Sequence, residues 1–415
     1  MDYFSYRDSE LWVEGAPLRK IAEAVGTPAF VYSSAALRDN LAAYDKAFAQ
    51  VPHLVCYSVK AASSLAILAL VAKGGRGADV VSGGELYRAL KAGVPAGKIV
   101  YSGVGKTAGE MAEALDAGIM LFNVESEPEL DLLSRVARER SKKAPVAVRV
   151  NPDVDPGTHP YVATGLRESK FGLPPDAALA LCLRASQDPA LEVLGVDCHI
   201  GSQLTSAAPF AAAVERLAVL VGDLSARGVK LRYLDLGGGL GINYNGESPP
   251  TPAEYAAAVI KASDGLGLTL VLEPGRSVVG NACVMLTTVL YDKNVGGGRP
   301  RFVIVDGAMS DLLRPSLYGA YHGIVPVRKT GAPEIKVSVV GPVCESGDFL
   351  ARDRPLQTVV PGDLLAVGSA GAYGFSMSSN YNSRTRAAEV LVDGGAFRVV
   401  RDRESYDDLT RGEHF

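Results

Sequence analysis

Residues 54–62 read LVCYSVKAA, an apolar run that ends in a lysine and continues into small residues. The run is short, rich in residues that strands favour, and followed by a stretch of helical period, so it predicts a buried β-strand leading into a helix. A single βα unit leaves the backbone hydrogen-bonding groups of its strand unpaired. The rest of the chain must therefore supply neighbouring strands.

The same pattern recurs from about Thr27 to Gly275. The expected strands lie near Leu54–Val59, Ala78–Val81, Ile99–Ser102, Met120–Val124, Val146–Asn151, Val193–His199, Tyr233–Leu236 and Thr269–Glu273. This number and length of βα units predicts an α/β fold built on a TIM-like (β/α)₈ barrel. A doubly wound open sheet is the alternative, because periodicity does not show whether a sheet closes.

After Gly275 the helical period mostly disappears. Short β-rich runs recur instead, at Ala282–Tyr291, Arg301–Val305, Ile335–Val340, Leu364–Val367 and Ala388–Val392. They predict a C-terminal, mostly β domain of the sandwich or barrel type over residues 276–415, following a barrel domain over residues 27–275. Residues 1–26 are expected to pack with the β domain, with residues 11–13 forming a strand.

Composition excludes several classes of protein. Of the 415 residues 47% are hydrophobic and 21% charged, which is too apolar for a disordered chain. The net charge is -4, so the chain lacks the basic excess expected of a protein that binds nucleic acid or an anionic membrane. It also lacks a long apolar segment of the kind that predicts a membrane anchor. Five widely spaced cysteines without a CxxC pair favour reduced thiols and a cytoplasmic protein.

Chemistry in a (β/α)₈ barrel is expected at the carboxyl ends of the strands. Lys60 ends the first strand, where its amine could bond covalently to an aldehyde; a lone lysine there is more often simply solvated. Residues 237–239 are three glycines after the seventh strand, where this fold usually binds a phosphate, although a plain tight turn would read the same. The spacing around them does not fit a dinucleotide-binding fingerprint.

Two more strand ends complete a pattern. A carboxylate at Glu273 could keep a pyridine nitrogen protonated, and His199 could lie on a ring face, although a lone histidine is often structural. Together with Lys60 and the glycines, these groups describe a pyridoxal phosphate site. The five histidines show no metal-ligand spacing, so no metal is expected.

The chain resembles the diaminopimelate decarboxylase family, which belongs to the alanine-racemase-like, fold-type III class of pyridoxal phosphate enzymes. The resemblance extends from residue 26 to about residue 394 and rests on motifs that occur in the family's order. They are Tyr57-Ser58-Val59-Lys60-Ala61, residues 77–86 (GADVVSGGEL), His199-Ile200-Gly201-Ser202-Gln203, Glu273-Pro274-Gly275-Arg276, Arg314-Pro315-Ser316-Leu317-Tyr318, Cys344-Glu345-Ser346-Gly347-Asp348 and Gly371-Ala372-Tyr373-Gly374. One departure is Ala62, where the family more often has asparagine.

The resemblance implies a carboxy-lyase that converts meso-2,6-diaminopimelate into L-lysine and CO2, the last step of lysine biosynthesis. By position it implies that Lys60, His199 and Cys344 are catalytic, with Cys344 as proton donor. The cofactor contacts it implies are Lys60, Asp79, His199, Ser202, Gly239, Glu273, Pro274, Gly275, Arg276 and Tyr373, with Arg149 as a lesser contact. The implied substrate contacts are Arg276, Arg314, Tyr318, Glu345 and Tyr373. It also implies a homodimer in which the loop at Cys344–Glu345 enters the partner's site.

Three alternatives remain open on the sequence. One is another pyridoxal phosphate-dependent amino acid decarboxylase of the same fold. Another is a racemase, although racemases of this fold usually place an arginine, not an acid, opposite the ring nitrogen. The third is a non-catalytic relative, which would be expected to lose Lys60 or Cys344; both are present.

Overall fold

The computed structural model describes residues 3–155, 170–294, 296 and 300–415. The chain forms two compact units. The barrel unit comprises Asn40–Ile242 and Ser248–Ser277, and the β unit comprises Met1–Asp39, Asn243–Glu247 and Val278–Phe415. The domain boundaries drawn from the sequence, after residues 26 and 275, stay predictions.

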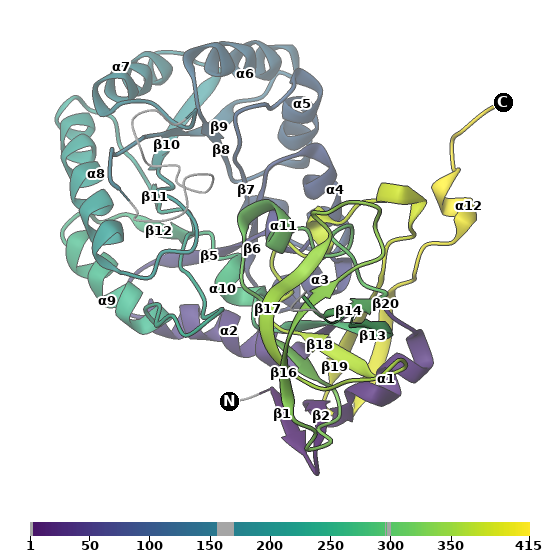
Figure 1. Ribbon diagram of the computed structural model, residues 1–415. Helices are drawn as coiled ribbons and strands as arrows, with labels where there is room; N and C mark the ends of the chain where they lie inside the picture. Colours follow the sequence, from purple (N-terminus) through teal and green to yellow (C-terminus); the bar gives the residue numbers. More distant parts are fainter. Residues whose placement is uncertain (1–2, 156–169, 295, 297–299) are drawn as a thin grey trace. The chain divides into compact units, whose positions relative to one another are not determined.

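Parallel strands form a closed barrel, which confirms the predicted barrel and excludes the open sheet (Figure 1). In chain order they are β5 (His53–Ser58), β6 (Gly77–Val80), β7 (Ile99–Tyr101), β8 (Leu121–Val124), β9 (Ala144–Arg149), β10 (Leu191–Asp197), β11 (Tyr233–Asp235) and β12 (Thr269–Leu272). Each overlaps one of the predicted strands. The circle closes where β12 pairs with β5 through Leu272 and Val55.

Helices alternate with these strands and ring the barrel (Figure 1). They are α2 (Ser34–Ala47), α3 (Leu65–Lys73), α4 (Gly83–Lys91), α5 (Ala108–Ala117), α6 (Glu127–Glu139), α7 (Pro175–Ser186), α8 (Ala208–Ala226), α9 (Pro252–Ala262) and α10 (Arg276–Val279). Several begin at a hydroxyl cap: the side chain of Ser82, Thr107, Ser126 or Thr251 accepts a hydrogen bond from the backbone N–H three residues on. Ser82 and Ser126 follow the ends of β6 and β8 by two residues, so these two helices begin soon after a strand ends. Because the barrel strands are parallel, their carboxyl ends lie at one mouth.

The barrel interior is built in layers. Buried apolar side chains form one layer, which comprises Cys56, Val100, Leu121, Ala147, Leu194 and Val271. Side chains two residues apart on a strand point to the same face, so the next inward position on each strand lies nearer the carboxyl end. Those positions are polar, with β10 displaced by one residue at its register shift between Val193 and Gly195: Ser58, Asp79, Ser102, Asn123, Arg149, Asp197, Asp235 and Glu273. A dry apolar floor thus supports a polar layer at the mouth.

The β unit contains a mixed sheet in the order β17-β16-β14-β13-β4-β19-β20, with β18 pairing to β13 and β15 to β18. The strands are β4 (Ala29–Ser33), β13 (Cys283–Lys293), β14 (Phe302–Val305), β15 (Ile324–Pro326), β16 (Glu334–Val340), β17 (Phe349–Gln357), β18 (Leu364–Val367), β19 (Ala388–Asp393) and β20 (Ala396–Arg401). Two short helices belong here, α11 (Arg314–Tyr318) and α12 (Tyr406–Leu409). The mostly β character predicted for this part of the chain is confirmed.

The N-terminal segment packs on this sheet. It forms β1 (Phe4–Arg7), β2 (Glu10–Val13), β3 (Ala16–Pro17) and α1 (Leu18–Val25). Leu11, Val13 and Ile21 share one buried cluster with Val284 and Val390 of the sheet. The predicted strand at residues 11–13 is β2. Packing this segment on the sheet removes apolar surface of both partners from water. This is energetically favourable and holds the segment in place.

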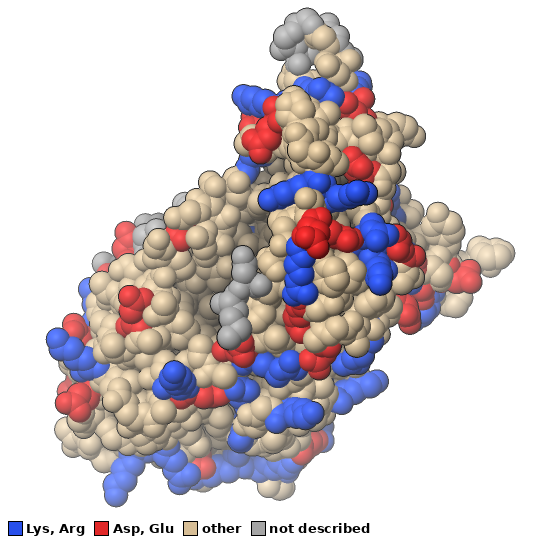
Figure 2. Space-filling view, turned by 90° about the horizontal axis from the view of Figure 1, so that it is seen from below, with Lys and Arg blue, Asp and Glu red and all other residues tan. Residues whose placement is uncertain are grey.

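Basic and acidic side chains lie side by side over the face displayed in Figure 2. No helix among the described residues is long and apolar enough to cross a membrane. All five cysteines are unpaired in the structure, and Cys344 is the exposed one of the five.

Candidate active site in the barrel

Lys60 follows β5, in the turn η1 (Val59–Ala61). Its Nζ lies 2.8 Å from Oδ2 of Asp79, whose side chain is fully buried, while the Lys60 side chain keeps 34% exposure. Ser58 also donates to Asp79 Oδ2, at 2.5 Å. Burial opposes ionisation of Asp79, but the charge and hydrogen bonds of Lys60 outweigh it, so the pKa of Asp79 is lowered. Asp79 therefore holds the lysine amine at the rim of the barrel.

Glu273 follows β12 and is buried, with 4% exposure. Its Oε1 lies 3.4 Å from the Ser102 hydroxyl. Burial, followed by the charges of Asp235 and Asp79, raises the pKa of Glu273 well above its usual range. A carboxyl in this setting binds a proton readily and can share it with a basic nitrogen.

His199 follows β10 and stays neutral. Its Nδ1 lies 3.1 Å from the Gly238 backbone N–H. Because an N–H always donates, Nδ1 is the acceptor and the ring proton sits on Nε2. Burial and the positive charges of Arg149 and Lys60 lower the pKa of His199 to about 3. An uncharged imidazole can lie flat on an aromatic ring without carrying a cation into the pocket.

The triple glycine brings backbone very close to its neighbours. A Cβ on Gly238 would lie 2.2 Å from the Glu273 carbonyl oxygen, and one on Gly239 would lie 2.5 Å from the Gly201 carbonyl oxygen. Gly237 and Gly239 also have positive φ angles, +60° and +120°. These positions therefore require glycine both for space and for backbone conformation. A plain tight turn, the alternative considered from the sequence, would not need such close contacts.

Arg276 begins α10 and is buried. Its Nη2 donates to the Ser202 hydroxyl at 2.9 Å. Pro274 and Gly275 hold this turn against β5, since the Ser58 N–H donates to the Pro274 carbonyl at 3.1 Å and a Cβ on Gly275 would meet Ser58 at 2.9 Å. The structure thus joins the predicted motifs at residues 199–203 and 273–276.

A pocket of about 400 Å³ opens among these strand ends. Lys60, Ser102, Arg149, Asp197, His199 and Glu273 are among its lining residues. Its size suits a small cofactor. An amine that can attach an aldehyde, an interior acid, a neutral imidazole and backbone that only glycine permits fit pyridoxal phosphate in chemical type.

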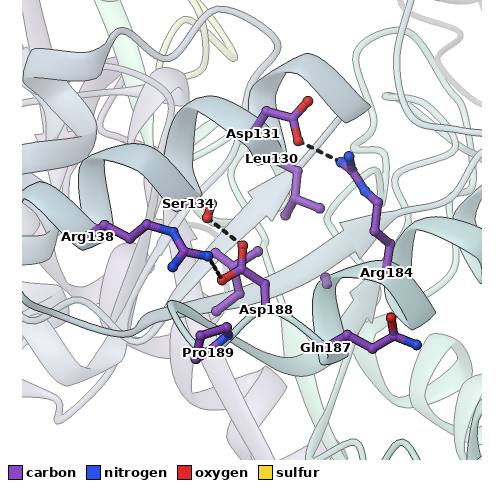
Figure 3. Close-up of a pocket in the computed structure, with 10 residues that line it drawn as sticks. Leu130, Asp131, Ser134, Arg138, Arg184, Gln187, Asp188 and Pro189 are labelled. Carbon is purple, nitrogen blue, oxygen red and sulfur yellow. Dashed lines mark hydrogen bonds and ion pairs between the residues drawn. The ribbon is translucent and has the colours of Figure 1, made fainter.

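A second pocket lies on the outside of the barrel, beside α6 and the loop that leads from α7 to β10 (Figure 3). Its charged side chains already pair with one another: Arg138 with Asp188, and Arg184 with Asp131 at 2.9 Å. Ser134 donates to Asp188 at 2.5 Å. The charged side chains of this pocket thus pair with one another, and none of the predicted site residues is among those that line it.

The remaining predicted site residues lie in the β unit. Arg314 and Tyr318 are the first and last residues of α11, and Tyr373 follows β18 with a positive φ of 57°. Arg314 is buried; its Nη1 lies 2.9 Å from His322 Nε2 and its guanidinium carbon lies 4.6 Å from the centre of the Tyr244 ring. Since arginine can only donate, His322 Nε2 accepts and its Nδ1 donates to the Gly368 carbonyl at 2.9 Å.

Cys344 and Glu345 lie in the loop between β16 and β17, and both are exposed. The buried carboxylate of Asp348 holds this loop by accepting 2.6 Å hydrogen bonds from the N–H groups of Met309 and Val343. The Cys344 N–H donates to Asn382 Oδ1 at 2.9 Å. The Cys344 thiol is thus exposed, and a hydrogen bond to its backbone holds it in place.

Sequence reasoning missed a set of buried polar residues beneath the pocket. Asn123 and Asp235 were not selected, although Asn123 Nδ2 donates to Asp235 Oδ2 at 3.0 Å and to Ser102 Oγ at 3.1 Å. Glu125 was also missed; its carboxylate pairs with Arg149 at 2.7 Å. The signal for Asn123 and Asp235 was a polar residue at an inward position of a predicted strand. A buried strand tolerates such a residue only when its side chain has a hydrogen-bond partner.

Comparison with known proteins gives the same class of enzyme. Residues 34–280 match the family model described as pyridoxal-dependent decarboxylase, pyridoxal binding domain. The fold and these residues define a pyridoxal phosphate-dependent decarboxylase, a carboxy-lyase.

Individual relatives narrow this class. The chain is 54% identical to a diaminopimelate decarboxylase of Pseudomonas aeruginosa, over 100% of this chain and 99% of the relative. It resembles a crystal structure of the Helicobacter pylori diaminopimelate decarboxylase complexed with L-lysine, with a TM-score of 0.92, 42% identity and coverage of 95% and 98% of the two chains. A crystal structure of the diaminopimelate decarboxylase from m. jannaschii, also in complex with L-lysine, gives a TM-score of 0.95 at 38% identity and covers 100% of this chain and 98% of that chain. The chain belongs to the diaminopimelate decarboxylase family.

Proposed function

We propose that this protein decarboxylates meso-2,6-diaminopimelate to L-lysine and CO2, the last step of lysine biosynthesis. The observation that carries the proposal is the Lys60 amine, held 2.8 Å from buried Asp79 at the edge of the pocket that Glu273 and His199 line. Relatives named for this activity, two of them solved with L-lysine, support the choice of substrate.

The barrel unit would hold the cofactor. Lys60 would carry it covalently, with Asp79 orienting the amine. His199 would lie on the ring, and Glu273 would hold a proton at the ring nitrogen. Ser202, Gly239 and the turn at residues 274–276 would surround the phosphate and the ring. When bound, pyridoxal phosphate supplies an electron sink for the charge left by departing CO2.

The substrate carries an amino acid group at each end, so one end must be held while the other reacts. Arg276 and Arg314 suit the distal carboxylate because a guanidinium pairs bidentately with it. Glu345 suits the distal ammonium, and Tyr318 and Tyr373 would complete the contacts. A site for ornithine or lysine would need the acid without the two arginines.

Cys344 would donate the proton that replaces the lost carboxylate, which fits an exposed thiol held by its backbone hydrogen bond to Asn382. We place this loop at the partner's site in a homodimer with two shared sites, and we place the enzyme in the cytoplasm. The five unpaired cysteines support the cytoplasmic assignment, and the homodimer follows from the family resemblance.

The test is direct. Purified protein is incubated with pyridoxal phosphate and meso-diaminopimelate, and lysine and CO2 are measured, with ornithine and L-lysine as competing substrates. Lysine formation in equal amount to CO2 is expected. Racemisation of diaminopimelate without CO2 release would instead establish a racemase, and faster CO2 release from ornithine would overturn the substrate assignment.

A further inference from the structure

Two aromatic rings of the β unit contact the Arg314 guanidinium. Its Nη1 donates to His322 Nε2 at 2.9 Å, and its carbon lies over the Tyr244 ring, 4.6 Å from the ring centre. The Tyr244 and His322 rings meet edge to face, with centroids 5.5 Å apart and planes at 75°. The guanidinium thus lies over one ring and donates to the edge of the other.

His322 is neutral, and both of its ring nitrogens form hydrogen bonds. Arginine can only donate, so Nε2 accepts; the Gly368 carbonyl can only accept, so Nδ1 donates to it at 2.9 Å. His322 has 0% exposure, so water cannot replace either of these partners. The contacts with His322 and Tyr244 therefore orient the guanidinium without neutralising its charge.

Backbone pairing determines where His322 lies. The helix α11 ends at Gly319, which adopts the left-handed conformation (φ 62°) that lets the chain turn. The next strand, β15, pairs with β18 and so brings His322 beside Gly368. The Gly368 N–H donates in turn to the Gly323 carbonyl at 2.7 Å. Two hydrogen bonds thus join this segment to the end of β18 and hold the imidazole beside Arg314.

The Tyr244 ring comes from a separate part of the chain. Residues 243–247 belong to the β unit, although the segments on both sides of them belong to the barrel unit. Glu247 closes a tight turn there, because its Oε2 accepts the N–H groups of Tyr244 and Asn245 at 2.8 and 2.5 Å. This turn fixes the backbone that carries the ring over Arg314.

We propose that His322 and Tyr244 are positioning residues, which set the orientation in which the Arg314 guanidinium receives the distal carboxylate of diaminopimelate. The inference rests on the proposed function, in which Arg314 binds that carboxylate. A bidentate pair needs two parallel N–H groups aimed at the two carboxylate oxygens. A long arginine side chain loses rotamer freedom when it forms such a pair, and contacts that already fix it reduce this cost. Both residues therefore act on how tightly the substrate is held.

The first experiment compares two replacements of His322 in the cofactor-loaded enzyme. The side-chain oxygen of His322→Gln reaches the place of Nε2 and can accept from Arg314. The side-chain nitrogen of His322→Asn reaches the place of Nδ1 and can donate to Gly368, but the acceptor for Arg314 is lost. Each variant removes one partner of a buried group, so the two are matched in their expected loss of stability.

These variants should differ in KM. His322→Asn is expected to raise KM for diaminopimelate about tenfold while kcat stays within about twofold of wild type, because a hydrogen bond that orients a charged group is lost. His322→Gln should change both constants by less than about threefold. A merely structural role would make the two variants alike, and that result would overturn the inference.

Inhibitors show whether the lost binding concerns the carboxylate. L-Lysine keeps the distal amino acid group of the substrate, whereas cadaverine is the same molecule without the carboxylate. His322→Asn should raise the inhibition constant of L-lysine about tenfold and that of cadaverine by less than about twofold. Equal changes for the two inhibitors would contradict the assignment.

Tyr244 offers a pair of variants that leaves the buried histidine in place. Tyr244→Phe keeps the aromatic face and should change KM by less than about twofold, whereas Tyr244→Leu should raise KM and the L-lysine inhibition constant about threefold. If His322→Asn does not fold, this pair decides the point. Equal constants in the two Tyr244 variants would then overturn the inference.

A double variant tests whether His322 acts through the arginine. Arg314→Lys should raise KM by itself, because an ammonium cannot pair bidentately with a carboxylate. Adding His322→Asn should raise KM little further, since the group that His322 orients is gone, and effects that multiply would contradict the proposal. Lysine formation by wild-type enzyme is measured first, so failure of the inference is distinct from failure of the proposed function.

Discussion

Residues proposed for one reaction are held in two different ways. In the barrel unit, Asp79, Glu273 and Arg276 are buried, and they extend from strand ends or the turns that follow them. In the β unit, Cys344 and Glu345 are exposed on a loop that a few hydrogen bonds hold in place. A closed barrel fixes many side chains at once, whereas each loop residue depends on its own local contacts. The proposed function thus assigns cofactor chemistry to the closed barrel and proton delivery to the exposed loop.

Replacing the barrel lysine should have the largest effect. Lys60→Ala is expected to abolish turnover and the absorbance of the attached cofactor, since Lys60 carries the amine that pairs with Asp79 among the described residues. Lys60→Arg is the matched control, because it keeps a cation for buried Asp79 but cannot attach an aldehyde. It should retain the stability of wild type and lose the absorbance. A cofactor band that survives dialysis in Lys60→Ala would reject Lys60 as the attachment point.

The next test compares a buried ion pair of the barrel with an exposed pair of the β unit. Lys106 has a side-chain exposure of 1%, and its Nζ donates to Glu129 at 2.7 Å and to the carbonyls of Gly103 and Asn123. Lys106→Met should lower the free energy of unfolding by about 3–5 kcal/mol, because it leaves a buried carboxylate unpaired. Lys336→Met removes a pair with Asp353 whose partners are 71% and 69% exposed, and should cost at most about 1 kcal/mol.

Urea unfolding measures both changes, and adding Glu129→Leu to Lys106→Met should recover part of the loss. Equal losses for the two single variants would show that burial does not distinguish the pairs.

On the loop of the β unit, Cys344→Ala should reduce turnover by a factor on the order of 10², the usual contribution of a positioned acid. The cofactor's absorbance should be unchanged, since the barrel holds the cofactor. Cys182→Ala is the control, because that thiol is buried on α7 and burial raises its pKa to about 12. Wild-type turnover in Cys344→Ala, or loss of the cofactor band, would contradict the division of roles.

The last comparison concerns pH. The pKa of His199 is lowered to about 3 in the folded protein, from 6.5 when unfolded, so the unfolded chain binds more protons between these values. The stability that neutral His199 contributes is present above pH 6.5 and is lost as the pH falls toward 3, with a slope of up to about 1.4 kcal/mol per pH unit. Relative to wild type, cofactor-free His199→Gln should therefore gain stability as the pH falls through this window. His414→Gln, at an exposed position, should run parallel to wild type.

The barrel strands could be predicted because each is a short apolar run bounded by helical periodicity. Closure could not, because the pairing of Leu272 with Val55 joins strands more than 200 residues apart. In the β unit, β17 and β20 were not predicted. Both lie at sheet edges, and their charged residues, with Pro355 in β17, interrupt the alternation of apolar and polar residues that indicates a strand. β4 was missed because it precedes the barrel in sequence yet pairs with β13 and β19.

The same distinction applies to the site. Lys60, His199 and Glu273 could be found because each ends a predicted strand in a recognisable motif. Asn123 and Asp235 lie within strands, 112 residues apart, and the need for each becomes visible once the barrel brings the two side chains together. Residues of the β unit came from motif resemblance, since exposed loops carry no periodic signal.

The most direct measurement is peptide mapping by mass spectrometry after wild-type protein, loaded with pyridoxal phosphate, is reduced with borohydride to make the cofactor's bond permanent. The cofactor's mass is predicted on the peptide that contains Lys60. Its appearance on a peptide carrying any other lysine, such as Lys106, would contradict the site described for the barrel.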